Sequence, residues 1–460
     1  MSDTPYHELY RPQFHFTARR DWLNDPNGLV FYDGEYHLCF QHTPGSLAWG
    51  PNTWGHAVSR DLVRWQQIAH AVEPDEMGWI WSGSAVVDHD NTAGFQTGED
   101  KVIVAVYTAG DNTESTPVPC AQCIAYSNDR GRTFTKYEGN PVVAHIRADN
   151  RDPKVLRHEP SGQWVMALYL DGEDYVLLAS PDLKHWEKLC DVPMPGISEC
   201  PDFFELPIDG DPTNTRWIFW GGNGNYRLGF FDGKTFEPET GPIQSNFGGN
   251  SYAGQSWSDI PAADGRWSDG RRLQITWMAG GQYPDMPFNQ QMSFPVEVTL
   301  RSTPDGPRLH REPVREIELL HGARHAWGNL TLRPGENPLA GLSGDLFDLR
   351  AVIEPGSAEE VAFVLRGEPV VYNVARQEIS CLRTQASSGH TAPLRLIDGR
   401  IQLRMLLDRT SLEVFGNHGE ISMPTCFLPD QENLSLAVQA TGGEAKIVEL
   451  EVAEVRSAWD

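Results

Sequence analysis

The stretch WLNDPNGLVFYDGEYHLCFQ, residues 22–41, indicates the kind of fold that this chain adopts. Its second part, LVFYDGEYHLCFQ (29–41), reads as two strands, and the Asp33-Gly34 pair between them is typical of two-residue hairpin turns. Its first part contains DPNG (25–28), which has the chemistry of a tight turn because proline presets φ and Asn-Gly tolerates positive φ. We therefore expect a turn at DPNG and then a β-hairpin.

The same design returns along the chain. QWVMALYLDGEDYVLLAS (163–180) and RWIFWGGNGNYRLGFFDG (216–233) also read as hairpins, whereas stretches with helical periodicity are short. A weak repeat, in which a strand ends at Ser, turns through Asp and re-enters at an aromatic residue, recurs roughly every 50 to 70 residues, the size of a four-stranded propeller blade with its loops. The alternative is that these are three unrelated Asp turns. The three copies are SRDLVRW (59–65), SNDRGRTF (127–134) and SPDLKHW (180–186).

The composition changes after MSFPVEVTLRSTPDGPRLHREPV (292–314), where the part rich in Trp and Gly ends. From about Ala323 onward the strands are plainer and evenly spaced, as in LFDLRAVIEP, EEVAFVLRG and IQLRMLLDRTSLEVFGN, which favours a β-sandwich. The sequence therefore predicts an all-β protein with a propeller domain over residues 1–315 and a β-sandwich domain over residues 323–460.

The bulk composition limits the partners that this chain can have. Its 460 residues are 40% hydrophobic, which allows a sizeable core, and 63 acidic against 37 basic residues give a formal charge of −26. Because such a surface repels phosphate backbones and anionic lipids, we expect neither a nucleic-acid partner nor a membrane partner. No apolar run reaches the ~18 residues of a membrane span, and MSDTPYHELYRPQFHFT has no apolar signal region. We expect a cytoplasmic protein, or a secreted one if a leader was trimmed.

The cysteines do not predict a metal or redox site. There are seven, an odd number in a chain too long to need disulfide staples, so we expect reduced thiols. The single C-x-x-C pair, Cys120 and Cys123, has no second pair beside it, and no HExxH or similar ligand spacing occurs. We expect no metal and no cofactor.

Three short segments each pair a carboxylate with an unusual neighbour: Asn24-Asp25, Arg151-Asp152-Pro153 and Glu199-Cys200-Pro201. Taken singly, they read as a turn, a local ion pair and a segment without special meaning. In a propeller, however, the first strand of every blade lies at the central funnel, so carboxylates far apart in sequence can meet there. The occurrence of one such segment per blade favours a shared site.

Two carboxylates on opposite sides of one bond are what glycoside hydrolysis requires. One is ionised and attacks the anomeric carbon, and the other holds a proton for the leaving oxygen. An apolar wall and a neighbouring carboxylate raise the pKa of the acid, and we expect Cys200, Phe203 and Phe204 to form such a wall beside Glu199. Asn24 is placed to donate to Asp25 and keep it charged.

Aromatic residues suited to stacking on sugar rings collect in the first half of the chain beside Gly, Ser and Asn, although core packing explains several of them. They are Trp22, Trp49, Trp54, Trp79, Trp81, Trp257 and Trp277.

At the three carboxylate segments the sequence resembles glycoside hydrolase family 32, the β-fructofuranosidases. The family motifs WMNDPNG, RDP and EC are similar to WLNDPNG, RDP and SEC here, and FQH, WGPNTWGHAVS, WSGS and ITWM match further. DRTSLEVFGNHGE resembles the signature of the family's sandwich, so that the resemblance runs from about residue 12 to 455. It implies a five-bladed β-propeller followed by a C-terminal β-sandwich.

The resemblance also implies roles. Asp25 would be the nucleophile that forms a fructosyl-enzyme intermediate, and Glu199 the general acid and then the base that activates water. Asp152 would bind fructose hydroxyls and stabilise the transition state. Trp22 and Leu23 would anchor the turn that presents Asp25. The residues expected to bind the terminal fructose are Asn24, Gln41, Trp49, Trp81, Ser82, Arg151 and Trp277.

One departure from the family bears on the substrate. Plant invertases of the family carry D-x-G-x shortly before a Tyr-Ala pair, and that Asp favours sucrose, whereas SNFGGNSYAGQSW has Asn246 in its place. GGQYPDMPFNQQMSFPVEVTLR (280–301) is more similar to the corresponding stretch of microbial levanases and exo-inulinases than to that of plant invertases. We expect a retaining exo-β-fructosidase that removes terminal non-reducing β-D-fructose from fructans and fructo-oligosaccharides, with sucrose as a lesser substrate.

Other readings remain open at this point. A fructosyltransferase or a sucrose-preferring invertase of the same family would carry the same carboxylates. SNDRGRTF is close to the Asp box of sialidase-type propellers, but a sialidase needs an arginine cluster and a tyrosine nucleophile. A non-catalytic fructan-binding module would be expected to lack one of the three carboxylates, and all three are present.

Overall fold

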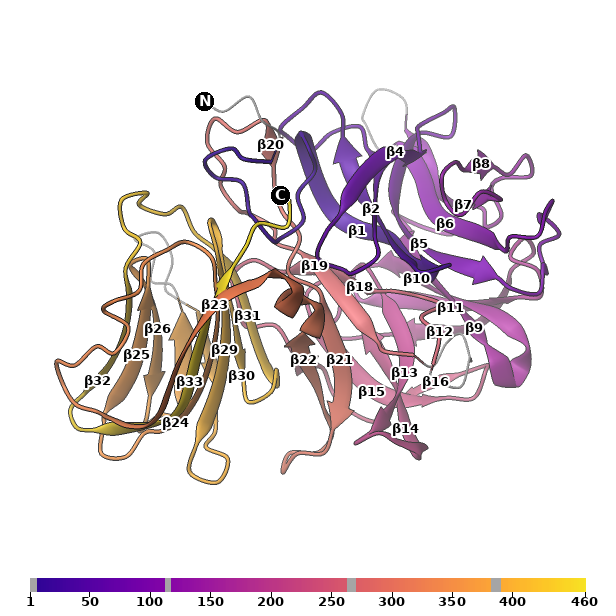
Figure 1. Cartoon of the computed structure of the whole chain (residues 1–460). Helices are drawn as coiled ribbons and strands as arrows, with labels where there is room; N and C mark the ends of the chain where they lie inside the picture. Colours follow the sequence, from indigo (N-terminus) through magenta and orange to yellow (C-terminus); the bar gives the residue numbers. More distant parts are fainter. Residues whose placement is uncertain (1–5, 112–116, 263–269, 382–389) are drawn as a thin grey trace.

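The computed structural model describes residues 6–111, 117–262, 270–381 and 390–460. In these ranges nearly every element is a strand, and the exceptions are two short 3-10 helices, η1 (Glu159–Ser161) and η2 (Arg315–Leu320). No helix of the described chain is long and apolar enough to cross a membrane. Figure 1 shows the two domains side by side, with the strands of the first half arranged in a ring.

The ring contains five groups of four antiparallel strands, in which consecutive strands lie beside one another. The first strand of each group is its inner strand, and a parallel pairing of Ile208 with Leu300 joins the last two groups into one sheet. The fivefold propeller is thereby confirmed. The blades are β1 (Asp21–Tyr32), β2 (Glu35–Thr43), β3 (Thr53–Ser59) and β4 (Gln66–Val72); β5 (Trp79–Asp88), β6 (Val102–Asp111), β7 (Val118–Ser127) and β8 (Thr135–Lys136); β9 (Arg151–His158), β10 (Gln163–Asp171), β11 (Asp174–Ser180) and β12 (Glu187–Pro193); β13 (Asp202–Ile208), β14 (Asp211–Trp220), β15 (Asn225–Phe231) and β16 (Phe236–Pro238); and β18 (Tyr252–Ser256), β19 (Leu273–Trp277), β21 (Val296–Arg301) and β22 (Arg308–Pro313). Short β17 (Ile243–Gln244) pairs with β15, and β20 (Phe288–Asn289) pairs with β1.

The second domain is the predicted β-sandwich. Six strands form one sheet in the order β23-β33-β24-β29-β30-β31, and five form the other in the order β28-β27-β26-β25-β32. Alternate residues of both sheets face a common hydrophobic core, as expected from the even spacing of the sequence. The strands are β23 (His321–Leu332), β24 (Phe347–Glu354), β25 (Glu360–Leu365), β26 (Glu368–Asn373), β27 (Glu378–Cys381), β28 (His390–Pro393), β29 (Ile401–Asp408), β30 (Ser411–Gly416), β31 (Ile421–Cys426), β32 (Leu436–Thr441) and β33 (Ala445–Val455).

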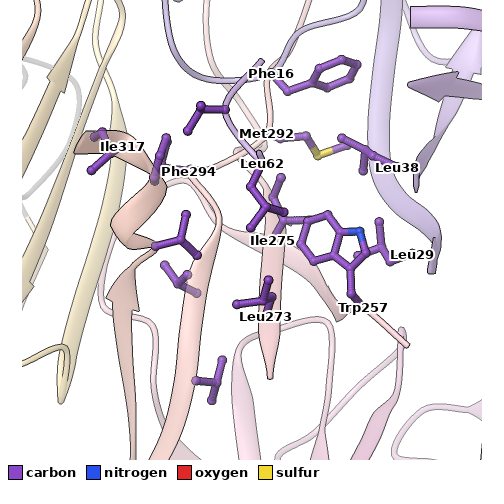
Figure 2. Close-up of a cluster of buried hydrophobic side chains, with 14 of the residues drawn as sticks. Phe16, Leu29, Leu38, Leu62, Trp257, Leu273, Ile275, Met292, Phe294 and Ile317 are labelled. Atoms are coloured by element: carbon purple, nitrogen blue, oxygen red, sulfur yellow. The ribbon is translucent and has the colours of Figure 1, made fainter. Parts of the chain in front are cut away.

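The ring closes between the first and the last blade. Ser258 donates its backbone N–H to Leu29 O and accepts one from Phe31, both at 3.0 Å. Leu29 of β1 and Trp257, which follows β18, belong to the same buried hydrophobic cluster, part of which Figure 2 shows. Backbone hydrogen bonds and apolar packing therefore both hold the last blade against the first.

The DPNG segment is not the tight turn that we expected. Strand β1 runs through it without interruption, and the pairing register with β2 shifts twice, between Leu23 and Pro26 and between Asn27 and Val30. Gly28 has φ +53°, and a Cβ there would lie 2.8 Å from the ring of Trp54. The segment is thus a double bulge, which accommodates the proline and the positive φ while the flanking Leu23 and Leu29 remain fully buried.

The three Asp turns are equivalent parts of three blades, as the repeat predicted. Each connects the third strand of a blade to its fourth strand. In each, the serine hydroxyl and the aspartate carboxylate lie 2.7 to 3.2 Å apart, and the carboxylate accepts backbone N–H groups of the following turn. The pairs are Ser59 with Asp61, Ser127 with Asp129 and Ser180 with Asp182.

A buried ionic cluster joins the N-terminal segment to the sandwich. The ring of His15 contacts Asp408 at 2.8 Å through Nδ1 and Glu413 at 2.7 Å through Nε2. The Glu413 carboxylate also accepts the backbone N–H of Phe294 at 2.7 Å. Because His15, Asp408 and Glu413 are at most 1% exposed, this cluster is shielded from solvent screening.

Candidate active site

Side chains from the five inner strands meet around the propeller axis. Gly83 of β5 donates its N–H to Asn27 Oδ1 of β1 at 3.0 Å. Lys154 of β9 forms a buried ion pair with Asp202 of β13 at 3.1 Å, and Ser256 of β18 donates to the same Asp202 oxygen at 3.1 Å. These polar contacts connect neighbouring blades to one another.

Asp25 lies on the first bulge of β1 and is held by three side chains that the sequence had placed in the site. Ser82 Oγ donates to Asp25 Oδ2 at 2.5 Å, and Asn24 Nδ2 donates to Asp25 Oδ1 at 3.2 Å. Gln41 connects the two donors, because its Oε1 accepts from Asn24 at 3.0 Å and its Nε2 donates to Ser82 at 2.8 Å. The carboxylate orientation is therefore set before any substrate arrives.

The environment of Asp25 raises its pKa above the ordinary value. Burial is the largest cause, and the negative charge of Glu199 acts in the same direction. The hydrogen bonds from Ser82 and Asn24 and the charge of Arg151 act against it. The ionised form thus depends on these donors.

Asp152 is the second residue of β9, where the pairing register with β10 shifts, and it has φ +65°, an unusual conformation for a non-glycine residue. Its backbone N–H donates to Thr108 Oγ1 at 3.1 Å, and its Oδ2 accepts the backbone N–H of Cys200 at 3.1 Å. Burial and the charges of Asp25 and Glu199 raise the pKa of Asp152 to about 7, although Arg151 opposes the change. The two-sided hydrogen bonding holds this left-handed conformation in place.

Glu199 lies at the end of the loop before β13. Glu199 and Cys200 both have positive φ, 54° and 36°, so two successive non-glycine residues are left-handed. One carboxylate oxygen of Glu199 accepts from Arg151 and the other from the hydroxyl of Tyr252, while Tyr175 donates to the backbone carbonyl at 3.1 Å. Both side-chain and main-chain contacts therefore orient this residue.

Cys200, Phe203 and Phe204 do not form the apolar wall that we expected beside Glu199. Cys200 Sγ lies 3.8 Å from Asp25 Oδ2 and 3.5 Å from Asp152 Oδ2, so one sulfur atom contacts both other carboxylates. Phe203 and Phe204, however, lie on β13 and belong to buried hydrophobic clusters of the propeller. The Glu199 side chain instead contacts polar groups, those of Arg151 and Tyr252, because both phenylalanines are packed into the hydrophobic clusters of the propeller.

Three tryptophans form an aromatic rim on the second blade's side of the site. The rings of Trp79 and Trp81 are stacked, with an interplanar angle of 19°, and Trp49 contacts both, with centroids 5.7 and 5.8 Å away. Trp81 precedes Ser82, the donor to Asp25, and its indole N–H donates to Gly110 O at 3.0 Å. Trp49 is 46% exposed, so the rim offers an apolar surface to solvent next to the carboxylates.

Trp277 enters from the last blade. Its ring lies edge-to-face against Trp22, with centroids 6.1 Å apart, and its indole N–H donates to Gln290 Oε1 at 3.2 Å. Trp22 in turn donates to Asn24 Oδ1 at 2.9 Å. The ten predicted site residues thus lie in all five blades or in the segments that lead into them. Asn24, Asp25, Gln41 and Trp49 belong to the first blade, Trp81 and Ser82 to the second, Arg151 and Asp152 to the third, Glu199 to the segment before the fourth and Trp277 to the last.

The sequence reasoning missed Tyr252, Tyr175 and Thr108 as parts of the site. Tyr252 belongs to the Tyr-Ala pair noted in the sequence, which is the only signal that could have pointed to it. Thr108 and Tyr175 lie within regular strands, β6 and β11, and no local pattern distinguishes them from core residues. Among the described residues, no group of three or more His, Cys, Asp or Glu side chains is arranged to hold a metal ion.

This geometry agrees with comparisons to known proteins. Residues 15–313 match the N-terminal domain of glycosyl hydrolases family 32, and residues 316–454 match the C-terminal domain of the same family. The chain belongs to glycosyl hydrolases family 32. The family resemblance predicted from WLNDPNG, RDP and SEC is therefore confirmed. The first matched region ends with β22, and the second begins at the start of η2.

Several relatives of this family 32 glycoside hydrolase cover almost its whole length. A levanase of Bacillus subtilis is 41% identical over 99% of this chain and 72% of its own length. An extracellular exo-inulinase of Aspergillus ficuum is 30% identical over 99% of this chain and 96% of its own. The crystal structure of exo-inulinase from Aspergillus awamori superimposes with a TM-score of 0.88 at 26% identity, covering 99% of this chain and 100% of that one.

Proposed function

We propose that this family 32 hydrolase is a retaining exo-β-fructosidase that releases terminal non-reducing β-D-fructose from fructans and fructo-oligosaccharides, with sucrose as a lesser substrate. The observation that carries the proposal is the meeting of Asp25, Asp152 and Glu199 around Cys200, from three different blades. The levanase and exo-inulinase names of the relatives support the substrate class.

In the first step of this proposal, the Asp25 carboxylate attacks the anomeric C2 of the terminal fructosyl unit. The C2–O bond to the rest of the chain breaks, and Glu199 gives its proton to the leaving oxygen. The products of this step are a covalent fructosyl ester on Asp25 and a shortened saccharide with a free hydroxyl. Ser82 and Asn24 favour the reaction because they stabilise the ionised form of Asp25 before attack.

In the second step, Glu199 accepts a proton from water, and the resulting hydroxide attacks C2. The ester bond breaks, Asp25 is again a carboxylate, and fructose leaves. Two successive inversions at C2 give net retention of configuration. Arg151 supports both steps because it binds Glu199 and keeps its oxygen in place between the two proton transfers.

Asp152 has a different task in this scheme. Its backbone contacts hold its carboxylate at Cys200, beside the nucleophile, where it can accept hydrogen bonds from the hydroxyls of the fructose ring. As positive charge develops on the sugar, a carboxylate in a buried site stabilises it more strongly than in water. Asp152 therefore contributes to the transition state without forming a bond to C2.

The proposal is tested by substitution of the two reacting carboxylates and identification of products. Asp25→Asn and Glu199→Gln are each expected to lower kcat on kestose by orders of magnitude while the circular dichroism spectrum is unchanged. Asp305→Asn, which alters an exposed carboxylate on the β21–β22 turn, is the matched control and should keep full activity. Near-wild-type turnover by either site variant would refute its assigned role.

Chromatography of products from sucrose, inulin, levan and kestose tests the reaction type. Free fructose as the first product from each polymer, with kestose consumed faster than sucrose, is expected. Longer oligomers would instead identify a fructosyltransferase, and preference for sucrose would identify an invertase. Both outcomes would overturn the proposed activity while leaving the carboxylate roles intact.

A further inference from the structure

The loop that leads into the inner strand β18 is docked on the β-sandwich. Phe247 donates its backbone N–H to Ser422 O of β31 at 2.9 Å, and Asn250 donates its own to Pro424 O of the same strand at 3.1 Å. The Phe247 side chain packs against the hydrophobic core of the sandwich. This propeller loop therefore takes its conformation from the second domain.

Two glycines allow the close approach. A Cβ on Gly248 would lie 2.1 Å from Pro424 O, and a Cβ on Gly249 would lie 2.4 Å from His390 Nε2. Distances below 3.0 Å to a backbone atom require the backbone to move, so any side chain at Gly248 would push the loop away from β31. The contact is thus a close fit between the two domains.

The Asn250 side chain ties this loop to two other segments. Its Oδ1 accepts the backbone N–H of Cys426 in β31 at 2.8 Å, and its Nδ2 donates to Ala279 O at 2.5 Å. Ala279 follows Trp277 by two residues, and Asn250 precedes Tyr252 by two. One amide therefore links the sandwich to the strand that carries Tyr252 and to the segment that carries Trp277.

Tyr252 is the connection to the chemistry. Its hydroxyl donates to the carboxylate of Glu199, and Ala253, which follows it, donates its backbone N–H to Gly222 O at 2.9 Å, near the Glu199 loop. We infer that Asn250 is a positioning residue for Glu199, acting through Tyr252, so that the β-sandwich contributes to leaving-group protonation. This inference rests on the proposed role of Glu199 as the general acid.

Substrates with different leaving groups depend on the orientation of Glu199 to different extents. A sugar alkoxide leaves slowly without a proton, so hydrolysis of kestose depends on a correctly oriented acid. Fluoride leaves from β-D-fructofuranosyl fluoride with much less help from an acid, so the first turnover on that substrate depends mainly on Asp25. Loss of orientation at Glu199 should therefore reduce the two reactions by different factors.

The test compares Asn250→Leu, which keeps the size of the side chain but removes both amide contacts, with the wild type on these two substrates. We expect kcat on kestose to fall at least tenfold with little change in KM, and first-turnover fluoride release to fall less than twofold. Asp305→Ala is the matched control, because it removes a different interdomain contact, the 3.0 Å ion pair with Arg395, and should leave both rates unchanged.

A second variant keeps the inference testable if Asn250→Leu does not fold. Asn250→Asp retains an acceptor for the Cys426 N–H and loses only the donor to Ala279, so we expect an intermediate loss on kestose and none on the fluoride. Equal losses on both substrates, or no loss on either, would overturn the inference. If Glu199→Gln hydrolyses kestose normally, the proposed function has failed instead, whatever the Asn250 variants do.

Discussion

Replacing Ser82 by alanine tests how the nucleophile is kept ionised. Ser82 Oγ lies 2.5 Å from Asp25 Oδ2 and is the hydrogen-bond donor that most strongly opposes the effect of burial on the pKa of Asp25. Without the hydroxyl, burial and the charge of Glu199 remain and one of the opposing contacts is gone. The pKa of Asp25 should therefore rise further in the variant.

The size of the effect follows from the geometry. A hydrogen bond to a charged group contributes about 1.5–3 kcal/mol, so at acidic pH its loss should lower kcat/KM by roughly 10- to 100-fold. Because Asp25 must be ionised to attack C2, activity is lost as pH falls through its pKa. The acidic limb of the kcat/KM profile should therefore move to higher pH.

The assay is a pH profile of kcat/KM for kestose, measured in buffers of constant ionic strength. Ser84→Ala is the matched control, because Ser84 lies two positions along β5 and bonds Pro153 O at 2.8 Å and the Val155 N–H at 2.9 Å rather than Asp25. It should lower stability without moving the acidic limb. An unmoved limb in Ser82→Ala, or an equal shift in both variants, would refute the reasoning.

Two further results are expected. Tyr252→Phe removes one donor to Glu199 and should lower kcat/KM on kestose by about 10- to 100-fold, the equivalent of about 1.5–3 kcal/mol, in steady-state assays; a change below twofold would contradict the contact's importance. Burial alone would lower the pKa of His15, but hydrogen bonds and charges of Asp408 and Glu413 raise it from 6.5 to about 9. The charged form therefore contributes about 3 kcal/mol that is fully present below pH 6.5 and is lost as pH rises toward 9. Scanning calorimetry should show the wild-type Tm falling between pH 6.5 and 9, whereas His15→Phe should have a lower Tm at neutral pH that changes little over this interval. If Tm depends on pH equally in both proteins, the charged His15 does not stabilise the fold as we expect.

The strand content was predictable because its signals are local. Asp33-Gly34 fixes a hairpin whatever surrounds it, and Tyr32 does pair with Glu35 across that turn. The Ser-Asp turns repeat because three blades use the same local connection between their third and fourth strands. DPNG misled us for the same reason, since its local chemistry is that of a turn. Pairing with β2 and the burial of Leu23 and Leu29 on either side, which are both tertiary features, keep it inside a strand.

By itself, the sequence determined which residues have the chemistry of a family 32 site, because Asp25, Asp152 and Glu199 lie in short motifs whose residue types are informative without any partner. The tertiary structure alone decided how each of these residues is controlled. Tyr252 reaches Glu199, and Asn250 reaches the sandwich, only because the ring of blades and the second domain bring distant segments into contact. The pKa of a carboxylate likewise depends on burial and on neighbouring charges, and no order of residues along the chain specifies either before it folds.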